Sequence, residues 1–138
     1  MTPATNSLPV FHTLISEKFF LDKVEPAIQA LGWQPVAPDW EQAILPQIAA
    51  NPGLGVVLDL EEDTVDMLVL IKELQENHQT AAIPILGYSS HEREDLIEAA
   101  TAAGITVVQR SIFAANLVRV LMELVGYDPI ADRNGGAS

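Results

Sequence analysis

Residues 55–60 read Gly-Val-Val-Leu-Asp-Leu, an unbroken run of small and apolar side chains around one aspartate. Pro52 and Gly53 precede this run, and the acidic run Glu61–Asp63 follows it. A short β-branched run with such boundaries predicts a strand buried on both faces, as in a parallel sheet. Ligands of open parallel sheets bind outside the carboxyl ends of the strands, so Asp59 stands where a site would form.

The composition is that of one globular domain. The chain has 138 residues, of which 49% are hydrophobic, and this is enough to bury a sizeable core. It has no cysteine, which excludes disulfides, thiolate metal sites and cysteine nucleophiles. Seven basic against nineteen acidic side chains give a net charge of −12, which repels nucleic-acid phosphates. No segment has the roughly 18 apolar residues of a membrane span, so we expect a soluble, cytoplasmic protein that binds neither nucleic acid nor membrane.

Predicted strands and helices alternate along the chain. Short β-branched or apolar runs predict strands at residues 10–15, 33–36, 55–60, 83–88 and 105–108. Apolar side chains at helical spacing predict helices at about residues 20–31, 39–50, 63–77, 90–104 and 112–125. This alternation is typical of an α/β protein with a parallel sheet covered on both faces. We therefore expect a flavodoxin-like (βα)5 three-layer sandwich with strand order 2-1-3-4-5.

Domain boundaries and helix ends follow from the same pattern. The polar or glycine-rich segments 1–9 and 127–138 are expected to be flexible tails around one domain at residues 10–126. Pro26 is expected to kink the first helix or to delay its start, and Asp39 is a candidate N-cap of the second. The third helix is expected to turn these side chains inward: Val65, Leu68, Ile71 and Leu74.

The predicted topology brings polar side chains to one edge of the sheet. They follow the first, third, fourth and fifth strands: Ser16, Glu17, Asp59, Ser89, Gln109 and Arg110. Glu17 and Asp59 are carboxylates of the kind that bind Mg²⁺. Asp59 could attack phosphorus as a nucleophile, while Ser89 and Arg110 could contact the phosphoryl oxygens.

These residues resemble those of the receiver domains of bacterial response regulators, CheY-like proteins, over roughly residues 10–126. The resemblance implies that Asp59 occupies the phospho-acceptor position and Ser89 the position of a phosphate-contacting hydroxyl. It also implies that Glu17 is one of two acids that hold Mg²⁺ in that family, and that Arg110 stands near the position of a phosphate-contacting lysine. The segment Ala102–Gly104 before a strand is also similar to the family.

The sequence departs from the family at several places, among them Asp63, which replaces a proline of the loop after Asp59. Ser16 stands where the second acid of the pair is expected, and Arg110 stands where the lysine is expected. Met67 replaces a turn glycine, and Val107 occupies the place of the switching aromatic residue on the last strand. An arginine keeps the charge, but its planar fork does not reproduce a compact ammonium. The pattern is therefore that of an atypical receiver, or pseudo-receiver.

Each candidate residue also has a structural interpretation. Ser89 and Glu92 have the spacing of a capping box for the fourth helix. Arg110 could pair with Asp59 or with Glu17 and so block the site. The run Glu61–Asp63 is more often a solvated loop than a site.

The sequence hypothesis is a stand-alone receiver-like module of a two-component phosphorelay, without catalytic residues of its own. It acts through contacts with a histidine kinase or a downstream signalling protein, independently of phosphorylation. The alternative is a genuine phospho-acceptor that uses Asp59 and Mg²⁺, and a metal-dependent phosphatase ranks lower. A flavin or nucleotide binder ranks low because no glycine-rich phosphate loop follows the first strand. A homodimer through the last two helices and the strand between them is also expected.

Overall fold

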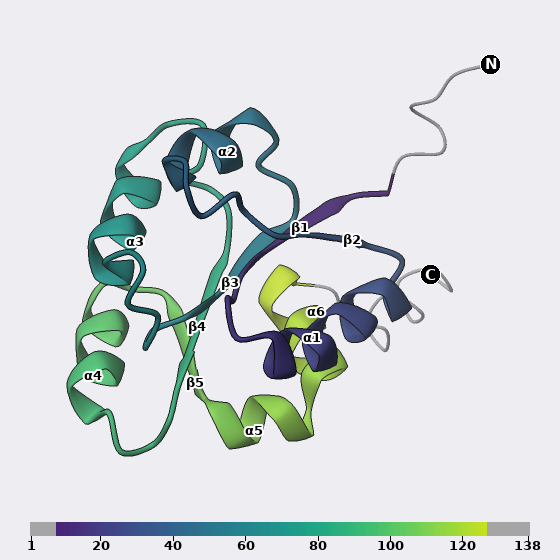
Figure 1. Cartoon of the computed structure of the whole chain (residues 1–138), viewed down its shortest axis with the longest axis vertical. Helices are drawn as coiled ribbons and strands as arrows, with labels where there is room; N and C mark the ends of the chain where they lie inside the picture. The colour runs from purple at the N-terminus through teal and green to yellow at the C-terminus, as the bar shows by residue number, and fades with distance from the viewer. Residues whose placement is uncertain (1–7, 127–138) are drawn as a thin grey trace, which may run out of the picture.

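A computed structural model describes residues 8–126 as one α/β domain (Figure 1). The strands of its sheet are β1 (Val10–Leu14), β2 (Gln34–Val36), β3 (Gly55–Asp59), β4 (Ile85–Ser89) and β5 (Thr106–Gln109). All neighbouring strands are parallel, in the order β2-β1-β3-β4-β5. The fold class and strand order predicted from the sequence are therefore confirmed. The predicted tails at 1–9 and 127–138 fall almost entirely outside the described residues.

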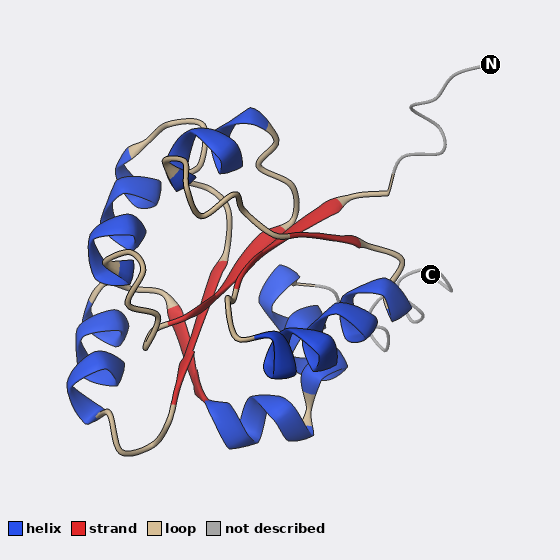
Figure 2. Cartoon of the chain, in the orientation of Figure 1, coloured by secondary structure: helices blue, strands red, loops and turns tan. Residues whose placement is uncertain are grey.

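Helices cover both faces of this sheet and make a three-layer sandwich (Figure 2). They are α1 (Lys18–Ala30), α2 (Ile44–Ala50), α3 (Met67–Glu76), α4 (Glu94–Ala102), α5 (Arg110–Ala115) and α6 (Leu117–Val125). In Figure 1, α2, α3 and α4 lie on one side of the sheet, and α1, α5 and α6 lie on the other. Each side has its own apolar core, built around Leu58 and Ile71 on one face and around Val57 and Ile28 on the other.

The strand β3 lies at the centre of the sheet and of both cores. Val56, Val57 and Leu58 are completely buried, with successive side chains entering opposite layers. Burying three such side chains stabilises the fold by roughly 1.5–3 kcal/mol each. Asp59 is half-buried at the end of this strand, opposite Tyr88 of β4.

The predicted helix at residues 112–125 is two helices, so the expectation of five helices was wrong. The chain breaks at Asn116, where φ is −141° and ψ is 38°, between α5 and α6. The Asn116 side chain donates a hydrogen bond to the carbonyl oxygen of Ile112 at 2.9 Å. This side-chain bond competes with the helical ladder, a tendency of asparagine that apolar periodicity does not reveal. The break lets Phe113 and Leu121 both enter the core on the α1 side.

The second helix starts later than predicted, and Asp39 is not its N-cap. The helix α2 begins at Ile44 with Ala43 as the N-cap. Asp39 instead accepts a hydrogen bond from the N–H of Glu41 at 3.0 Å, which closes a turn of its own. Of the two effects expected of Pro26, a kink or a delayed start, the delayed start is wrong, because α1 begins at Lys18 and contains Pro26. Residue 22, whose carbonyl Pro26 leaves without a helical donor, is exposed, so water can satisfy it.

The third helix also starts later than predicted and turns a somewhat different stripe inward. Its N-cap is Asp66, whose side chain accepts hydrogen bonds from the N–H groups of Leu68 and Val69. The buried residues of α3 are Met67, Leu70, Ile71 and Leu74. Leu68 is only half-buried, whereas Met67 and Leu70 are buried, so the stripe that faces the sheet is offset from the predicted one. Among residues 8–126, no helix is long and apolar enough to cross a membrane.

Gly53 provides a test of the close approach that brings β3 against β1. Its φ is +70°, and a Cβ there would lie 2.3 Å from the carbonyl oxygen of Val10, which accepts a hydrogen bond from Leu54. We expect Gly53→Ala to lower the free energy of unfolding by about 2–4 kcal/mol, from left-handed strain and the clash together. Gly104→Ala is the matched control, since Gly104 also has positive φ but nothing within 4 Å. It should cost only about 1–2 kcal/mol in urea unfolding. Equal costs would contradict the clash.

Candidate functional site

The carboxyl ends of β1, β3, β4 and β5 meet at one edge of the sheet, as the topology requires. The loops after these strands carry the residues that the sequence singles out: Ser16, Glu17, Asp59, Ser89 and Arg110. Charged side chains of the loop between β3 and α3 reach the same edge. We call this cluster, together with Glu61 and Glu62, the strand-end site.

Asp59 occupies the centre of the strand-end site. Its Oδ1 accepts a hydrogen bond from the backbone N–H of Glu61 at 2.9 Å. Burial raises the pKa of Asp59 above its ordinary value, and the negative charge of Glu61 adds to this. The hydrogen bond from Glu61 and the positive charge of Arg110 act in the opposite direction and leave the pKa still raised. Asp59 is therefore a less acidic carboxylate than an exposed one.

Arg110 forms an ion pair with Glu17, which settles the alternative that the sequence left open. Its Nη2 donates to Oε1 of Glu17, and the two side chains are 38% and 43% exposed. The guanidinium also lies over the ring of Phe20, 5.1 Å from its centroid. The start of α5 at Arg110 places this side chain across the edge towards the start of α1. The guanidinium of Arg110 is thus held against the carboxylate of Glu17.

Glu62 brings a carboxylate to the end of β1, where Ser16 stands in place of the second acid that the receiver family has. It accepts hydrogen bonds from the hydroxyl of Ser16 and, at 2.6 Å, from the hydroxyl of Thr64. Burial would raise the pKa of Glu62, but the hydrogen bonds from Ser16 and Thr64 outweigh it and hold the pKa below its usual range. This carboxylate is therefore bound by two hydroxyl donors of the chain itself.

Glu61 is bound in the same way at the end of β4. Its Oε2 accepts hydrogen bonds from the backbone N–H of Ser90 at 2.8 Å and from the hydroxyl of Ser89 at 3.3 Å. The predicted capping box of Ser89 with Glu92 is wrong, because Ser89 is the last residue of β4 and α4 begins only at Glu94. The interpretation of 61–63 as a merely solvated loop is also wrong for Glu61 and Glu62.

Tyr88 is a further residue of this edge that the sequence analysis missed. It pairs with Asp59 across the two central strands, and its ring packs 4.7 Å from Phe20 and 5.7 Å from Phe113 between centroids. The side chain is completely buried, and its hydroxyl has no hydrogen-bond partner among the described residues. Burial therefore raises the pKa of the Tyr88 phenol far above its usual value. An aromatic residue inside a strand pattern looks like ordinary core, so only the register places it beside Asp59.

The donor set does not fit a resident divalent cation. Within residues 8–126, no group of three or more histidine or carboxylate side chains lies close enough together to hold a metal ion. Glu17 is neutralised by Arg110, and Glu61 and Glu62 accept hydrogen bonds from hydroxyl and backbone donors. Mg²⁺ prefers oxygen ligands in near-octahedral geometry, and Asp59 alone does not provide it. Several carboxylates lie at this edge, but each one accepts a hydrogen bond or forms an ion pair within the chain.

Solved structures with the same architecture are receiver domains. One is the receiver domain of a sensor histidine kinase from Pseudomonas aeruginosa, with magnesium coordinated in its active-site cleft. It has a TM-score of 0.73 and 16% identity, and covers 87% of this chain and 99% of its own. The chain described here has the receiver-domain fold. The chemotaxis response regulator CheY4 of Vibrio cholerae has a TM-score of 0.72 and 13% identity, over 86% of this chain and 99% of its own.

A response regulator from Thermotoga maritima is similar to the same extent, with a TM-score of 0.70 and 17% identity. The match covers 86% of this chain and 98% of that one. No family model and no curated protein matches the sequence. The shared receiver fold is therefore carried by the arrangement of strands and helices rather than by sequence identity.

The raised pKa of Asp59 leads to a stability prediction. A carboxyl group whose pKa is raised on folding favours the folded state fully below its unfolded pKa of 3.8, and loses that contribution as the pH rises through its folded pKa. We therefore expect Asp59→Asn to raise the free energy of unfolding at pH 7, with a gain that shrinks towards pH 4. Denaturant unfolding at a series of pH values measures it.

The exposed Asp63 supplies the matched control for this measurement. Asp63→Asn should change the unfolding free energy by no more than about 0.5 kcal/mol, as is usual at exposed positions. An Asp59→Asn protein that is less stable than the unaltered chain at pH 7 would contradict burial as the dominant effect on this carboxyl group.

Proposed function

We propose that this protein is a receiver-like signalling module that acts through protein–protein contacts independently of phosphorylation. Its partner in this proposal is a histidine kinase or a downstream signalling protein, met in the cytoplasm. The module performs no catalytic turnover of its own. The receiver-domain fold supports the signalling role, since the similar solved structures are response regulators and a receiver domain of a kinase.

The observation that carries the phosphorylation independence is the ion pair between Arg110 and Glu17. Phosphoryl transfer to an aspartate needs a cation beside the transferred phosphoryl oxygens, because negative charge is concentrated on those oxygens. Here the cation nearest to Asp59 is bound to a carboxylate. A phosphoryl group would have to share Arg110 with Glu17, whose negative charge would oppose its approach.

The hydroxyl of Ser89 supports the same proposal. Ser89 occupies the phosphate-contact position, but its hydroxyl donates a hydrogen bond to the carboxylate of Glu61. Glu61 and Glu62 also add negative charge to the edge, which opposes the approach of a phosphate donor. The strand-end site is thus arranged to hold its loops in one conformation.

Treatment with acetyl phosphate and Mg²⁺, followed by intact-mass spectrometry, tests the proposal. We expect the mass of the protein to stay unchanged, because Arg110, Glu17, Glu61 and Glu62 are already engaged within the chain. Asp59→Asn is the control for modification elsewhere. A phosphoryl adduct on the unaltered chain that is lost in Asp59→Asn would establish Asp59 as a phospho-acceptor and overturn phosphorylation independence.

A pair of substitutions tests whether the departures from the receiver pattern at Ser16 and Arg110 prevent phosphorylation of Asp59. We expect the double variant Ser16→Asp, Arg110→Lys to gain an adduct under the same conditions, because it supplies a second acid and a compact cation. Adding Asp59→Asn to that variant should remove the adduct. If the double variant stays unmodified while its circular dichroism spectrum is native, these two positions are not what disables the site.

The alternative function, a genuine phospho-acceptor that uses Asp59 and Mg²⁺, has one observation in its favour. Asp59 stands half-buried at the end of the central strand, and the ion pair of Arg110 is made with Glu17 rather than with it. The carboxylate therefore keeps a route to solvent. The acetyl phosphate experiment separates this alternative from the preferred function.

A homodimer through α4, β5 and the last helices is part of the proposal. The strand β5 is an edge strand, and its Val107 and Val108 are only half-buried. Ile112 and Val118 are 48% and 39% exposed on the neighbouring helices. We expect a dimeric mass in analytical ultracentrifugation and a shift towards monomer in Ile112→Glu, while Val69→Glu on α3 leaves the mass unchanged. A monomer at high micromolar concentration in all three proteins would contradict the dimer.

A further inference from the structure

A groove that shares Arg110 with the strand-end site lies between α1, the loop after β4 and α5. It encloses about 390 Å³. Phe19, Phe20 and Ala114 give it an apolar wall, and its ionisable side chains are Lys23, His91 and Arg110. We call it the α1–α5 groove. Its size is near the lower end of that of ligand pockets, enough for one large side chain and its neighbours.

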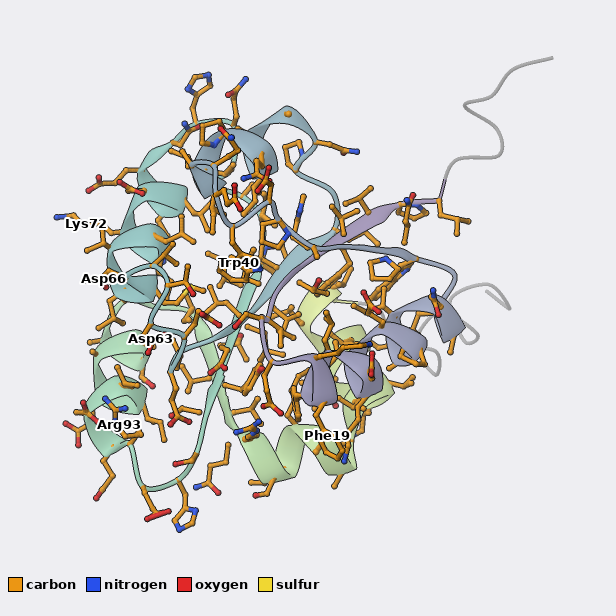
Figure 3. All side chains as sticks on the ribbon, in the orientation of Figure 1. Phe19, Trp40, Asp63, Asp66, Lys72 and Arg93 are labelled. Atoms are coloured by element: carbon orange, nitrogen blue, oxygen red, sulfur yellow. The ribbon has the colours of Figure 1, made fainter. Side chains whose placement is uncertain are left out.

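The charge of the α1–α5 groove is opposite to that of the chain. The chain carries a net charge of −12, yet no aspartate or glutamate is among the residues that line this groove. A second groove, beside the loop between β3 and α3, is lined by four acids and one cation, Arg93; the acids are Glu61, Glu62, Asp63 and Asp66. Figure 3 shows Phe19 on the α1–α5 side and Asp63 and Asp66 on the α3 side. The α1–α5 groove is therefore the more positive of these two grooves.

An exposed aromatic ring borders the same groove. Phe19 is 71% exposed, the most of the large apolar side chains in the described part of the chain. The ammonium of Lys23 lies 5.0 Å from the centroid of its ring. An exposed phenylalanine next to a cation gives a partner both apolar contact and charge, which is the composition of an interface centre.

The acidic neighbours of the groove leave donors for a ligand. Glu17 takes Nη2 of Arg110, but a guanidinium has five N–H donors in all. Asp22 pairs with Lys18, whose ammonium lies 3.0 Å from it, and not with Lys23. A carboxylate that entered the groove would therefore meet the ammonium of Lys23 and the remaining donors of Arg110.

We propose that the α1–α5 groove binds an acidic segment of a partner protein, with an aromatic side chain of that segment packed against Phe19 and Phe20. The carboxylates of the segment pair with Lys23 and Arg110. This inference rests on the proposed function, because it gives the chemistry of the partner that the module contacts. It requires neither Mg²⁺ nor a phosphoryl group.

The test uses the synthetic peptide acetyl-Glu-Glu-Phe-Asp-Glu-amide and the full chain labelled with ¹⁵N. Titration should shift the amide resonances of groove residues such as Ser90 and Ser111, and leave those of α3 in place. A peptide with Gln and Asn in place of the acids and a peptide with Ser in place of Phe should each bind about tenfold more weakly, the usual effect of removing one strong contact.

Two exposed residues allow variants that preserve the fold. Lys23→Glu and Phe19→Ser should each weaken binding of the acidic peptide about tenfold or more. Lys72→Glu and Val69→Ser on α3 are the matched controls, because Lys72 is exposed and Val69 is 51% exposed outside the groove. The two control proteins should bind the peptide as the unaltered chain does.

Three results with the peptides would overturn the proposal. They are equal binding of the amide peptide, full binding by Lys23→Glu and Phe19→Ser, and shifts that lie only outside the groove at millimolar peptide. Sedimentation with phosphatidylserine vesicles, without any binding of the acidic peptide, would assign the groove to a lipid surface and also overturn it. If the peptide does not bind, the outcome of the acetyl phosphate experiment is unaffected. A phosphoryl adduct on Asp59 likewise does not affect peptide binding, so the two proposals can be refuted separately.

Discussion

The complete burial of β3 between two helical layers is the constraint on which the rest of the structure depends. Val56, Val57 and Leu58 have no contact with solvent, and successive side chains enter opposite cores. A strand buried on both faces needs hydrogen-bonded neighbours on both edges and helices on both sides. β1 and β4 supply the neighbours, and the two groups of helices supply the cover. The first polar side chain beyond this buried segment, Asp59, is therefore forced to the edge of the sheet.

At that edge the chain satisfies its own charges. Each carboxylate near Asp59 has a donor from another loop: Arg110 for Glu17, Ser90 for Glu61 and Ser16 for Glu62. Bonds between loops at the ends of β1, β3, β4 and β5 hold these loops together, while a phosphate or a metal ion would have to break them. The same arrangement leaves Tyr88 with a buried hydroxyl that the surrounding core does not satisfy.

The charge distribution separates two sides of the molecule. The loop between β3 and α3 carries Glu61–Asp63, whereas Lys23 and Arg110 border the groove between α1 and α5. Glu61–Asp63 follow β3 and Arg110 begins α5, whereas Lys23 lies on an exposed position in the middle of α1. The receiver-domain fold here thus combines a strand-end site, whose carboxylates other than Asp59 are held by internal pairs, with a groove of different charge.

The sequence by itself determined the fold class, the strand order and the position of Asp59, because these follow from the alternation of buried runs with amphipathic segments. The predictions from the sequence failed where local hydrogen bonds of side chains decided the structure. Asn116 splits the last helix, and Asp39 closes a turn instead of capping α2. Only the tertiary structure decided that Arg110 binds Glu17, 93 residues away, and that Glu61 reaches Ser89 and Ser90. The choice between such partners depends on distances across the sheet edge, and no local pattern in the chain contains them.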